Sequence, residues 1–188
     1  SPETVRRFLR DEGARYVKLK TTPPLTDNHK ARRLSFARQH LQGNTDFRNW
    51  VWSDEKRFCL DGPDGLFYTW NLPEDQEQLK TKRAFNGGGV MVWGAIRHDH
   101  TVALVEVTVR MNSAAYQEIL SNHFLPHWEE FKAQGIVFQQ DNAPCHSSRS
   151  TAEWLRASGV TSVQWPALSP DLSPIENIWG YMGAKTSY

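Results

Sequence analysis

The chain has 188 residues, of which 39% are hydrophobic, and it carries eight Trp and nine Phe. This composition supplies enough apolar material for a sizeable core, which excludes an intrinsically disordered chain. It has no run of 18 apolar residues and no signal-peptide core, so we expect neither a membrane span nor a secreted protein. Its two cysteines exclude a disulfide framework and favour a reducing compartment. Because the first residue is not Met, we expect a fragment or processed product of a longer protein.

The net charge of +1 conceals an uneven distribution. Residues 1–42 hold ten Lys and Arg against four acidic residues, a balance of +6, whereas the rest of the chain holds twelve against seventeen, a balance of −5. A basic arm on a mildly acidic body favours a polyanionic partner that is held mainly by the arm. An ordinary solvated basic helix is the alternative explanation.

Two helices are predicted in the basic part. The first covers residues 1–10, begins with a Ser-Pro cap and ends near Gly13. Residues 18–25, which contain two prolines, indicate a linker. Residues 26–41 predict a basic helix, whose apolar side is formed by Leu34, Ala37 and Leu41.

Strands are predicted next. Residues 50–60 alternate in polarity, and residues 66–70 are expected to pair with them in a hairpin across residues 61–65. Two further strands are predicted over residues 89–96 and 102–109. One face of the first strand would carry Asp54 together with Trp50, Trp52, Phe58 and Leu60.

Helices and strands alternate in the C-terminal half. Strands in a meander followed by such an alternation predict a mixed α/β fold. The expected elements are a helix capped by Ser113 and interrupted by Pro126, a strand over 136–141, a helix over 148–158, a strand over 160–165 and a helix from 174.

Two aspartates lie on or after predicted strands. A carboxylate on an apolar strand face, as expected for Asp54, is costly unless it is paired or binds a metal. The alternative for Asp54 is a strand-end residue that faces solvent. Asp141 follows a short apolar run, which places it at the carboxyl end of a buried strand. The alternative for Asp141 is a turn or helix-cap residue before Asn142.

Glu176 lies in the first turn of the last predicted helix. Ser173 is expected to cap this helix, and Pro174 is expected to be its first residue. Glu176 is therefore either the reciprocal half of a Ser-x-x-Glu capping box or a carboxylate held in a fixed place for a site.

Four segments carry a resemblance to a known family. They are residues 52–58 (WSDEKRF), 87–94 (GGGVMVWG), 138–142 (FQQDN) and 169–177 (SPDLSPIEN). In this order they resemble the catalytic core of Tc/mariner-superfamily DNA transposases. Between Asp141 and Glu176 lie 34 residues, the spacing of the branch whose acidic triad ends in Glu. The resemblance covers nearly the whole chain.

The resemblance implies an RNase H-like fold and a metal-dependent enzyme. Asp54 and Asp141 would hold two Mg²⁺ or Mn²⁺ ions, and Glu176 would complete the site. Water would attack first and free a 3′-OH, which would then attack target DNA at a TA dinucleotide. This cut-and-paste transposase would act in the nucleus, as a homodimer on transposon-end and target DNA, without a membrane partner.

The resemblance also implies three regions. Residues 1–20 would be the tail of a helix-turn-helix DNA-binding domain, residues 21–45 a basic linker and helix, and residues 46–188 the catalytic domain. Residues 71–86 would reach over to the partner subunit or its DNA, although a surface loop is an equal alternative. The side chains expected to contact DNA are Arg6, Arg7, Arg10, Lys18, Lys20, Arg32, Arg33, Lys80, Lys82 and Arg83.

Neighbours of the acidic residues are assigned structural roles. His146 and Asn142 lie close enough to Asp141 in sequence to approach a substrate phosphate, but a role in the turn is preferred for both. Glu55 is expected on the opposite strand face from Asp54, in contact with solvent. Packing is the role assigned to Trp165 and Trp179.

Two other functions fit parts of the sequence. Another RNase H-like nuclease or integrase would share the triad, but the 34-residue gap and the flanking motifs disfavour it. An inactive domesticated remnant that only binds DNA or protein is disfavoured by the intact triad. The incomplete DNA-binding domain and the short segment after Glu176 favour such a remnant.

Overall fold

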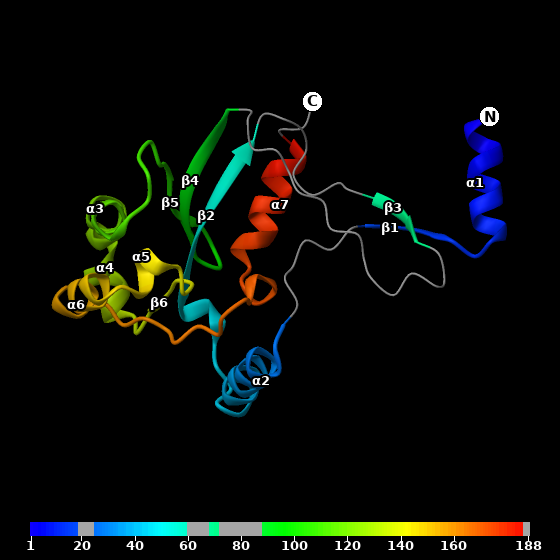
Figure 1. Ribbon diagram of the computed structural model, residues 1–188. Coiled ribbons are helices and arrows are strands. Elements are labelled where there is room, and N and C mark those ends of the chain that lie inside the picture. The colour runs from blue at the N-terminus through cyan, green and yellow to red at the C-terminus, as the bar shows by residue number, and fades with distance from the viewer. Residues whose placement is uncertain (19–24, 60–67, 72–87, 186–188) are drawn as a thin grey trace.

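The structure is a computed structural model, and it describes residues 1–18, 25–59, 68–71 and 88–185 (Figure 1). The sequence-predicted turn at 61–65 and the stretch 71–86, apart from residue 71, lie outside the described residues. So do Leu60, Lys20, Lys80, Lys82 and Arg83. None of the helices in the described ranges has the length and hydropathy that a membrane span requires.

A four-stranded mixed sheet forms the centre of the body. Its strands are ordered β5-β4-β2-β6, and only the β2–β6 pair is parallel. This sheet confirms the expected RNase H-like mixed α/β fold. The strand bounds are β2 (Trp50–Cys59), β4 (Gly89–Ile96), β5 (Thr101–Glu106) and β6 (Val137–Gln139).

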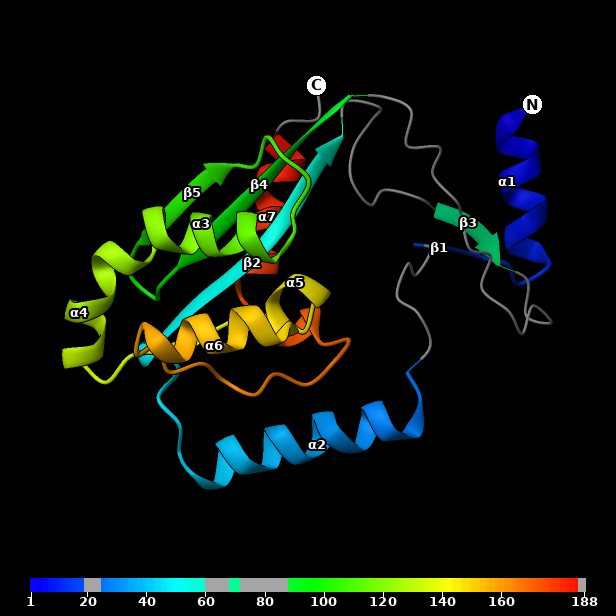
Figure 2. The same cartoon turned by 60° about the vertical axis from the view of Figure 1, so that its left-hand side comes forward.

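Helices cover both faces of the sheet (Figure 2). One face carries α7 (Ile175–Lys185), and the other carries α3 (Ser113–His123) and the helices that follow it. The alternation of side chains along β2 therefore directs even-numbered residues toward α7 and odd-numbered residues toward α3. The helices that follow α3 are α4 (Leu125–Ala133), α5 (Pro144–Ser147) and α6 (Arg149–Ala157).

Each face has its own apolar core. On the α3 face, Val51 and Trp93 are fully buried with the aromatic side chains of α3 and α4. On the α7 face, Trp50 and Trp52 pack with Trp165, Ile175 and Trp179. The predicted alternation over residues 50–58, with two Trp and Phe58 on one side, is confirmed by this second core.

The N-terminal segment lies beside this body. Helix α1 (Pro2–Asp11) is capped by Ser1 as predicted and buries none of its residues. Strand β1 (Arg15–Lys18) pairs antiparallel with β3 (Tyr68–Asn71). The hairpin predicted between residues 50–60 and 66–70 is wrong, because β3 pairs with β1, and β2 lies between β4 and β6.

Helix α2 (Asp27–Gln42) lies within one residue of its predicted bounds at each end but turns a different side to the body. The predicted apolar side is wrong, because Leu34 is 51% and Leu41 82% exposed. Phe36 makes the contact instead, with its ring centroid 5.2 Å from that of Trp165. Its ring packs edge-on against the rings of Trp50 and Trp165, an arrangement that aromatic side chains favour.

Two predictions in the C-terminal half also need correction. Asn112, and not Ser113, caps α3 by accepting a hydrogen bond from the Ala115 amide at 2.9 Å. Residues 160–165 form no strand but only a single bridge, between Ser162 and Phe138. Strand β6 has only three residues, so residues 160–165 have few backbone groups to pair with.

Candidate active site

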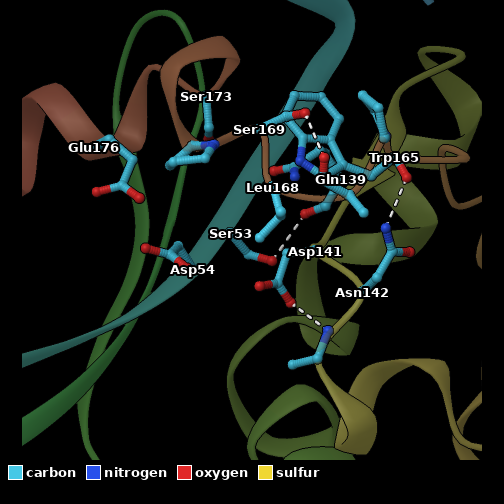
Figure 3. A pocket seen from close by; sticks show the side chains of 14 residues that line it. Ser53, Asp54, Gln139, Asp141, Asn142, Trp165, Leu168, Ser169, Ser173 and Glu176 are labelled. Carbon is cyan, nitrogen blue, oxygen red and sulfur yellow. Dashed lines mark hydrogen bonds between the residues drawn. The ribbon is translucent and has the colours of Figure 1, made fainter. Parts of the chain in front are cut away.

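One cavity of about 380 Å³ is lined by all three predicted acidic residues (Figure 3). Asp54 comes from β2, Asp141 follows the end of β6, and Glu176 comes from the first turn of α7. Their carboxylates enter the cavity from the sheet and from the helix that covers it. The opposite wall is the segment 165–170, which is mostly apolar.

Asp54 lies on the α7 face of the sheet because its position in β2 is even. Its Oδ2 accepts a hydrogen bond from Nε1 of Trp179 at 2.9 Å, which leaves Oδ1 for another ligand. Burial, together with the negative charges of Glu176 and Glu55, raises the pKa of Asp54 to about 7. The carboxylate is therefore held in a place where its negative charge is costly without a cation.

The pKa of Asp141 is shifted in the opposite direction from that of Asp54. Burial raises its pKa, but hydrogen bonds from His146 and the Ala143 amide outweigh burial and hold the pKa below the usual value. The Ala143 bond, at 2.8 Å, is the turn interaction that the alternative reading expected. It uses one oxygen only, so the turn does not prevent the carboxylate from lining the cavity.

Glu176 does not make the reciprocal bond of a capping box. The Ser173 amide, which such a bond would occupy, donates to the Pro170 carbonyl at 3.0 Å. The Ser173 hydroxyl is buried without a hydrogen-bond partner among the described residues. Burial raises the pKa of Glu176, Lys56 lowers it, and the charge of Asp141 raises it. Glu176 thus contributes negative charge to the cavity.

The donor set of the cavity suits a hard divalent cation. Its three carboxylates are oxygen ligands, and two of them have raised pKa values that a bound cation would lower. Within the described ranges, no three His, Cys, Asp or Glu side chains stand close enough together to hold one ion. Mg²⁺ commonly uses only one or two carboxylates and completes its shell with water and substrate phosphate, so the residues fit such an ion.

Two residues assigned from the sequence to a turn and to solvent, His146 and Glu55, lie behind Asp141. His146 is buried and contacts Asp141 through Nδ1 at 2.7 Å and Glu55 through Nε2 at 3.2 Å. Burial lowers the pKa of His146, but the two carboxylates outweigh burial and raise it to about 10. Glu55 does lie on the opposite face from Asp54, but its predicted exposure to solvent is wrong, because its side chain is 16% exposed.

Trp179 and Asn142 each combine packing with one directed hydrogen bond. Trp179 is three residues after Glu176 on α7, so both lie on the same face of the helix. This spacing is the signal in the sequence from which its contact with Asp54 follows. Asn142 donates to the Trp165 carbonyl at 2.8 Å and so ties the apolar wall to the segment that carries Asp141.

The side chains predicted to contact DNA lie apart from the cavity or outside the described residues. Arg6, Arg7 and Arg10 are exposed on α1, and Arg32 is exposed on α2. Arg33 makes a bidentate ion pair with Asp171, with its two nitrogen–oxygen distances at 2.7 and 2.5 Å. This pair fastens α2 to the segment before α7, so a phosphate would have to displace a carboxylate to reach Arg33. The backbone of Lys18 ends β1.

Two family models match the chain. One, described as a DDE superfamily endonuclease, matches residues 49–188, and the other, described as a transposase, matches residues 1–42. Among solved structures, the mariner Mos1 paired end complex with Mg has a TM-score of 0.72 and 22% identity, over 100% of this chain and 58% of that one. The catalytic domain of Mos1 mariner transposase has a TM-score of 0.64 and 17% identity, over 90% and 78%.

Curated relatives agree with the family models. The Tc3 transposase of Caenorhabditis elegans is 39% identical over 165 residues, which cover 88% of this chain and 50% of the relative. The Tcb2 transposase of Caenorhabditis briggsae is 36% identical over 188 residues, which cover 97% and 68%. The chain thus spans half the length of the Tc3 relative. It belongs to the Tc/mariner superfamily of DNA transposases, and its residues 49–188 to the DDE superfamily of endonucleases.

Proposed function

We propose that this chain is the catalytic core of a cut-and-paste DNA transposase. It hydrolyses phosphodiester bonds at transposon ends and joins the freed 3′ ends to target DNA at TA dinucleotides, with two Mg²⁺ or Mn²⁺ ions. The observation that carries the proposal is the single cavity lined by Asp54, Asp141 and Glu176. The Mos1 structures described as complexes with Mn or Mg, and as a strand transfer complex, support the metal and the joining step. A homodimer on the two DNA partners and a nuclear location belong to the same proposal.

The residues of the cavity have separate roles in this proposal. Asp54 and Asp141 are the metal ligands, because each has one oxygen fixed by a neighbouring donor and a second oxygen available. Glu176 completes the site from a rigid helix on the opposite side. When bound, the two ions supply an activated water nucleophile and stabilise the leaving oxygen. The apolar wall and the sheet restrict water around the reacting phosphate, which strengthens the electrostatic interactions within the cavity.

We expect the chain to nick supercoiled plasmid DNA in the presence of Mn²⁺, and we expect Asp141→Asn to reduce nicking to the level seen in EDTA. The substitution keeps the shape and the turn bond but removes a charged metal ligand. Nicking is measured by the conversion of supercoiled to open-circle plasmid on agarose gels. Equal nicking by the variant and the wild type would exclude the proposed role of Asp141. A folded wild type without metal-dependent nicking would support the inactive remnant instead.

DNA binding is expected to be weak, to have little sequence preference and to fall steeply with salt. Phosphate contacts release counterions, so the triple substitution of Arg6, Arg7 and Arg10 by Ala should reduce the slope of log affinity against log salt by up to about three. Fluorescence anisotropy with labelled duplexes gives the slope. The matched control is Arg149→Ala, because Arg149 is 91% exposed but lies on α6. A slope that changes equally in both variants would contradict a special role for α1.

A further inference from the structure

We propose that His146 and Glu55 are positioning residues, which fix the Asp141 carboxylate so that its Oδ2 is presented to a divalent ion in the cavity. The inference rests on the proposed function and extends it to two residues that do not line the cavity. The chain of contacts runs from Glu55 on β2, through His146 on α5, to Asp141 after β6.

Both hydrogen bonds to Asp141 end on the same oxygen. Oδ1 accepts from the Ala143 amide at 2.8 Å and contacts Nδ1 of His146 at 2.7 Å. Two donors from different directions on one oxygen prevent the carboxylate from turning about its Cβ–Cγ bond. The other oxygen, Oδ2, has no hydrogen-bond partner among the described residues, and Figure 3 shows it on the side of the cavity where Asp54 and Glu176 lie.

His146, the middle member of this series of contacts, is its most buried residue. The Asp141 side chain is 50% exposed, whereas the His146 side chain is 2% exposed. The His146 ring is also fixed from the side, because its centroid lies 4.0 Å from that of Tyr116. A buried ring held at both nitrogens has one orientation, so it transmits the position of the sheet to the carboxylate.

Glu55 lies at the fixed end of the series of contacts that leads through His146 to Asp141. Its carboxylate, 16% exposed, contacts Nε2 of His146 at 3.2 Å. Glu55 is the direct neighbour of Asp54 in β2 and points to the opposite face. One strand therefore sets the positions of both aspartates, Asp54 directly and Asp141 through His146. Groups that orient a metal ligand in this way commonly change metal affinity when they are removed.

The test is Mn²⁺ binding to the 188-residue chain, measured by isothermal titration calorimetry at 25 °C. We expect His146→Ala to weaken binding about 10–100-fold, as is typical for the loss of a group that orients a ligand. His146→Asn should recover most of the affinity, because an amide nitrogen can replace Nδ1 as the donor to Asp141. Where His146→Ala fails to fold, the loss of the Glu55→Ala effect in the His146→Asn background, described next, decides the test.

A double-mutant cycle tests whether Glu55 acts through His146. Glu55→Ala should weaken Mn²⁺ binding in the wild type but add no further loss in the His146→Ala or the His146→Asn background, since the path is already broken at Nε2. Additive losses would overturn the assignment of Glu55, because they would show an independent effect of its charge.

The matched control is Thr151→Val. Thr151 is fully buried on α6 and donates to the Cys145 carbonyl at 2.7 Å, so the substitution lowers stability close to His146 without touching the carboxylates. Mn²⁺ affinity should stay at the wild-type value. If Asp141→Asn weakens binding but His146→Ala and His146→Asn both bind like the wild type, the inference is overturned and the proposed function stands. If the wild type itself binds no Mn²⁺, both are overturned.

Discussion

At pH 8 and without divalent ions, Asp54→Asn is expected to raise the free energy of unfolding by about 2–3 kcal/mol. In the wild type, burial and the charges of Glu176 and Glu55 raise the pKa of Asp54 from 3.8 to about 7. A shift of this size corresponds to roughly 4 kcal/mol at 1.36 kcal/mol per pH unit, and the contact with the open cavity reduces it by solvent screening. Asn keeps the acceptor for Trp179 but carries no charge, so it removes this cost.

The gain in stability expected for Asp54→Asn depends on pH. Because the folded-state pKa of Asp54 is raised, its contribution to stability is fully present below pH 3.8 and is lost as the pH rises toward 7. The difference between Asp54→Asn and the wild type should therefore be small near pH 4 and grow until pH 7–8. Urea unfolding in EDTA at several pH values measures it.

Asp46→Asn is the control for this pH series. Hydrogen bonds from the Arg48 side chain and amide lower the pKa of Asp46 to about 2, so its contribution changes only below pH 3.8. The stability difference that it causes should stay constant between pH 5 and 8. If the stability difference from the wild type grew with pH in both variants, a general charge effect would explain it. If it did not change with pH for Asp54→Asn, the pKa of Asp54 would not be raised in the folded protein.

Gly94→Ala is expected to destabilise the fold by about 1–3 kcal/mol and to weaken Mn²⁺ binding. Gly94 faces α7 from β4, and a Cβ atom there would lie 2.6 Å from Cη2 of Trp179. Trp179 is only 2% exposed, and the backbone of Gly94 is fixed by its sheet partners. The Trp179 ring therefore has to move to make room for the added methyl group. Its Nε1 then leaves Oδ2 of Asp54, and the carboxylate loses the bond that orients it.

Gly180→Ala provides the matched comparison on the adjacent helix. A Cβ atom at Gly180 meets nothing within 4 Å, and Ala is favoured over Gly in a helix by about 1 kcal/mol. This variant should be more stable than the wild type and bind Mn²⁺ with equal affinity. Thermal melting and calorimetry check both properties. If Gly94→Ala were as stable as the wild type, the close packing of Trp179 against the sheet would be refuted.

Local patterns predicted the parts of the fold that local chemistry decides. The alternation along β2 placed Asp54 on the correct face, and the Ser-Pro cap located the start of α1. The pairing of β1 with β3 was missed, because hairpin formation favours sequence neighbours and no local signal marks a partner 50 or more residues away. The inward side of α2 was missed because Phe36 is a single aromatic residue outside the aliphatic stripe.

The candidate site was also predicted only in part. The lining of one cavity by Asp54, Asp141 and Glu176 agrees with the expectation from their places at a strand face, a strand end and a helix start. The partners of these residues were not predicted. Strand alternation gives the face of Glu55, but only the fold determines that α5, a helix of four residues, brings His146 there.

The hydrogen bond between Trp179 and Asp54 joins residues 125 positions apart, and the bond between Ser53 and the Gln139 carbonyl spans 86. Contacts of such long sequence separation form late in folding, since large loops must close first. During synthesis, α7 leaves the ribosome only after the whole sheet has been made. A nascent chain therefore carries an incomplete acidic cluster, and the proposed cleavage of DNA would require α7 to dock on the finished sheet.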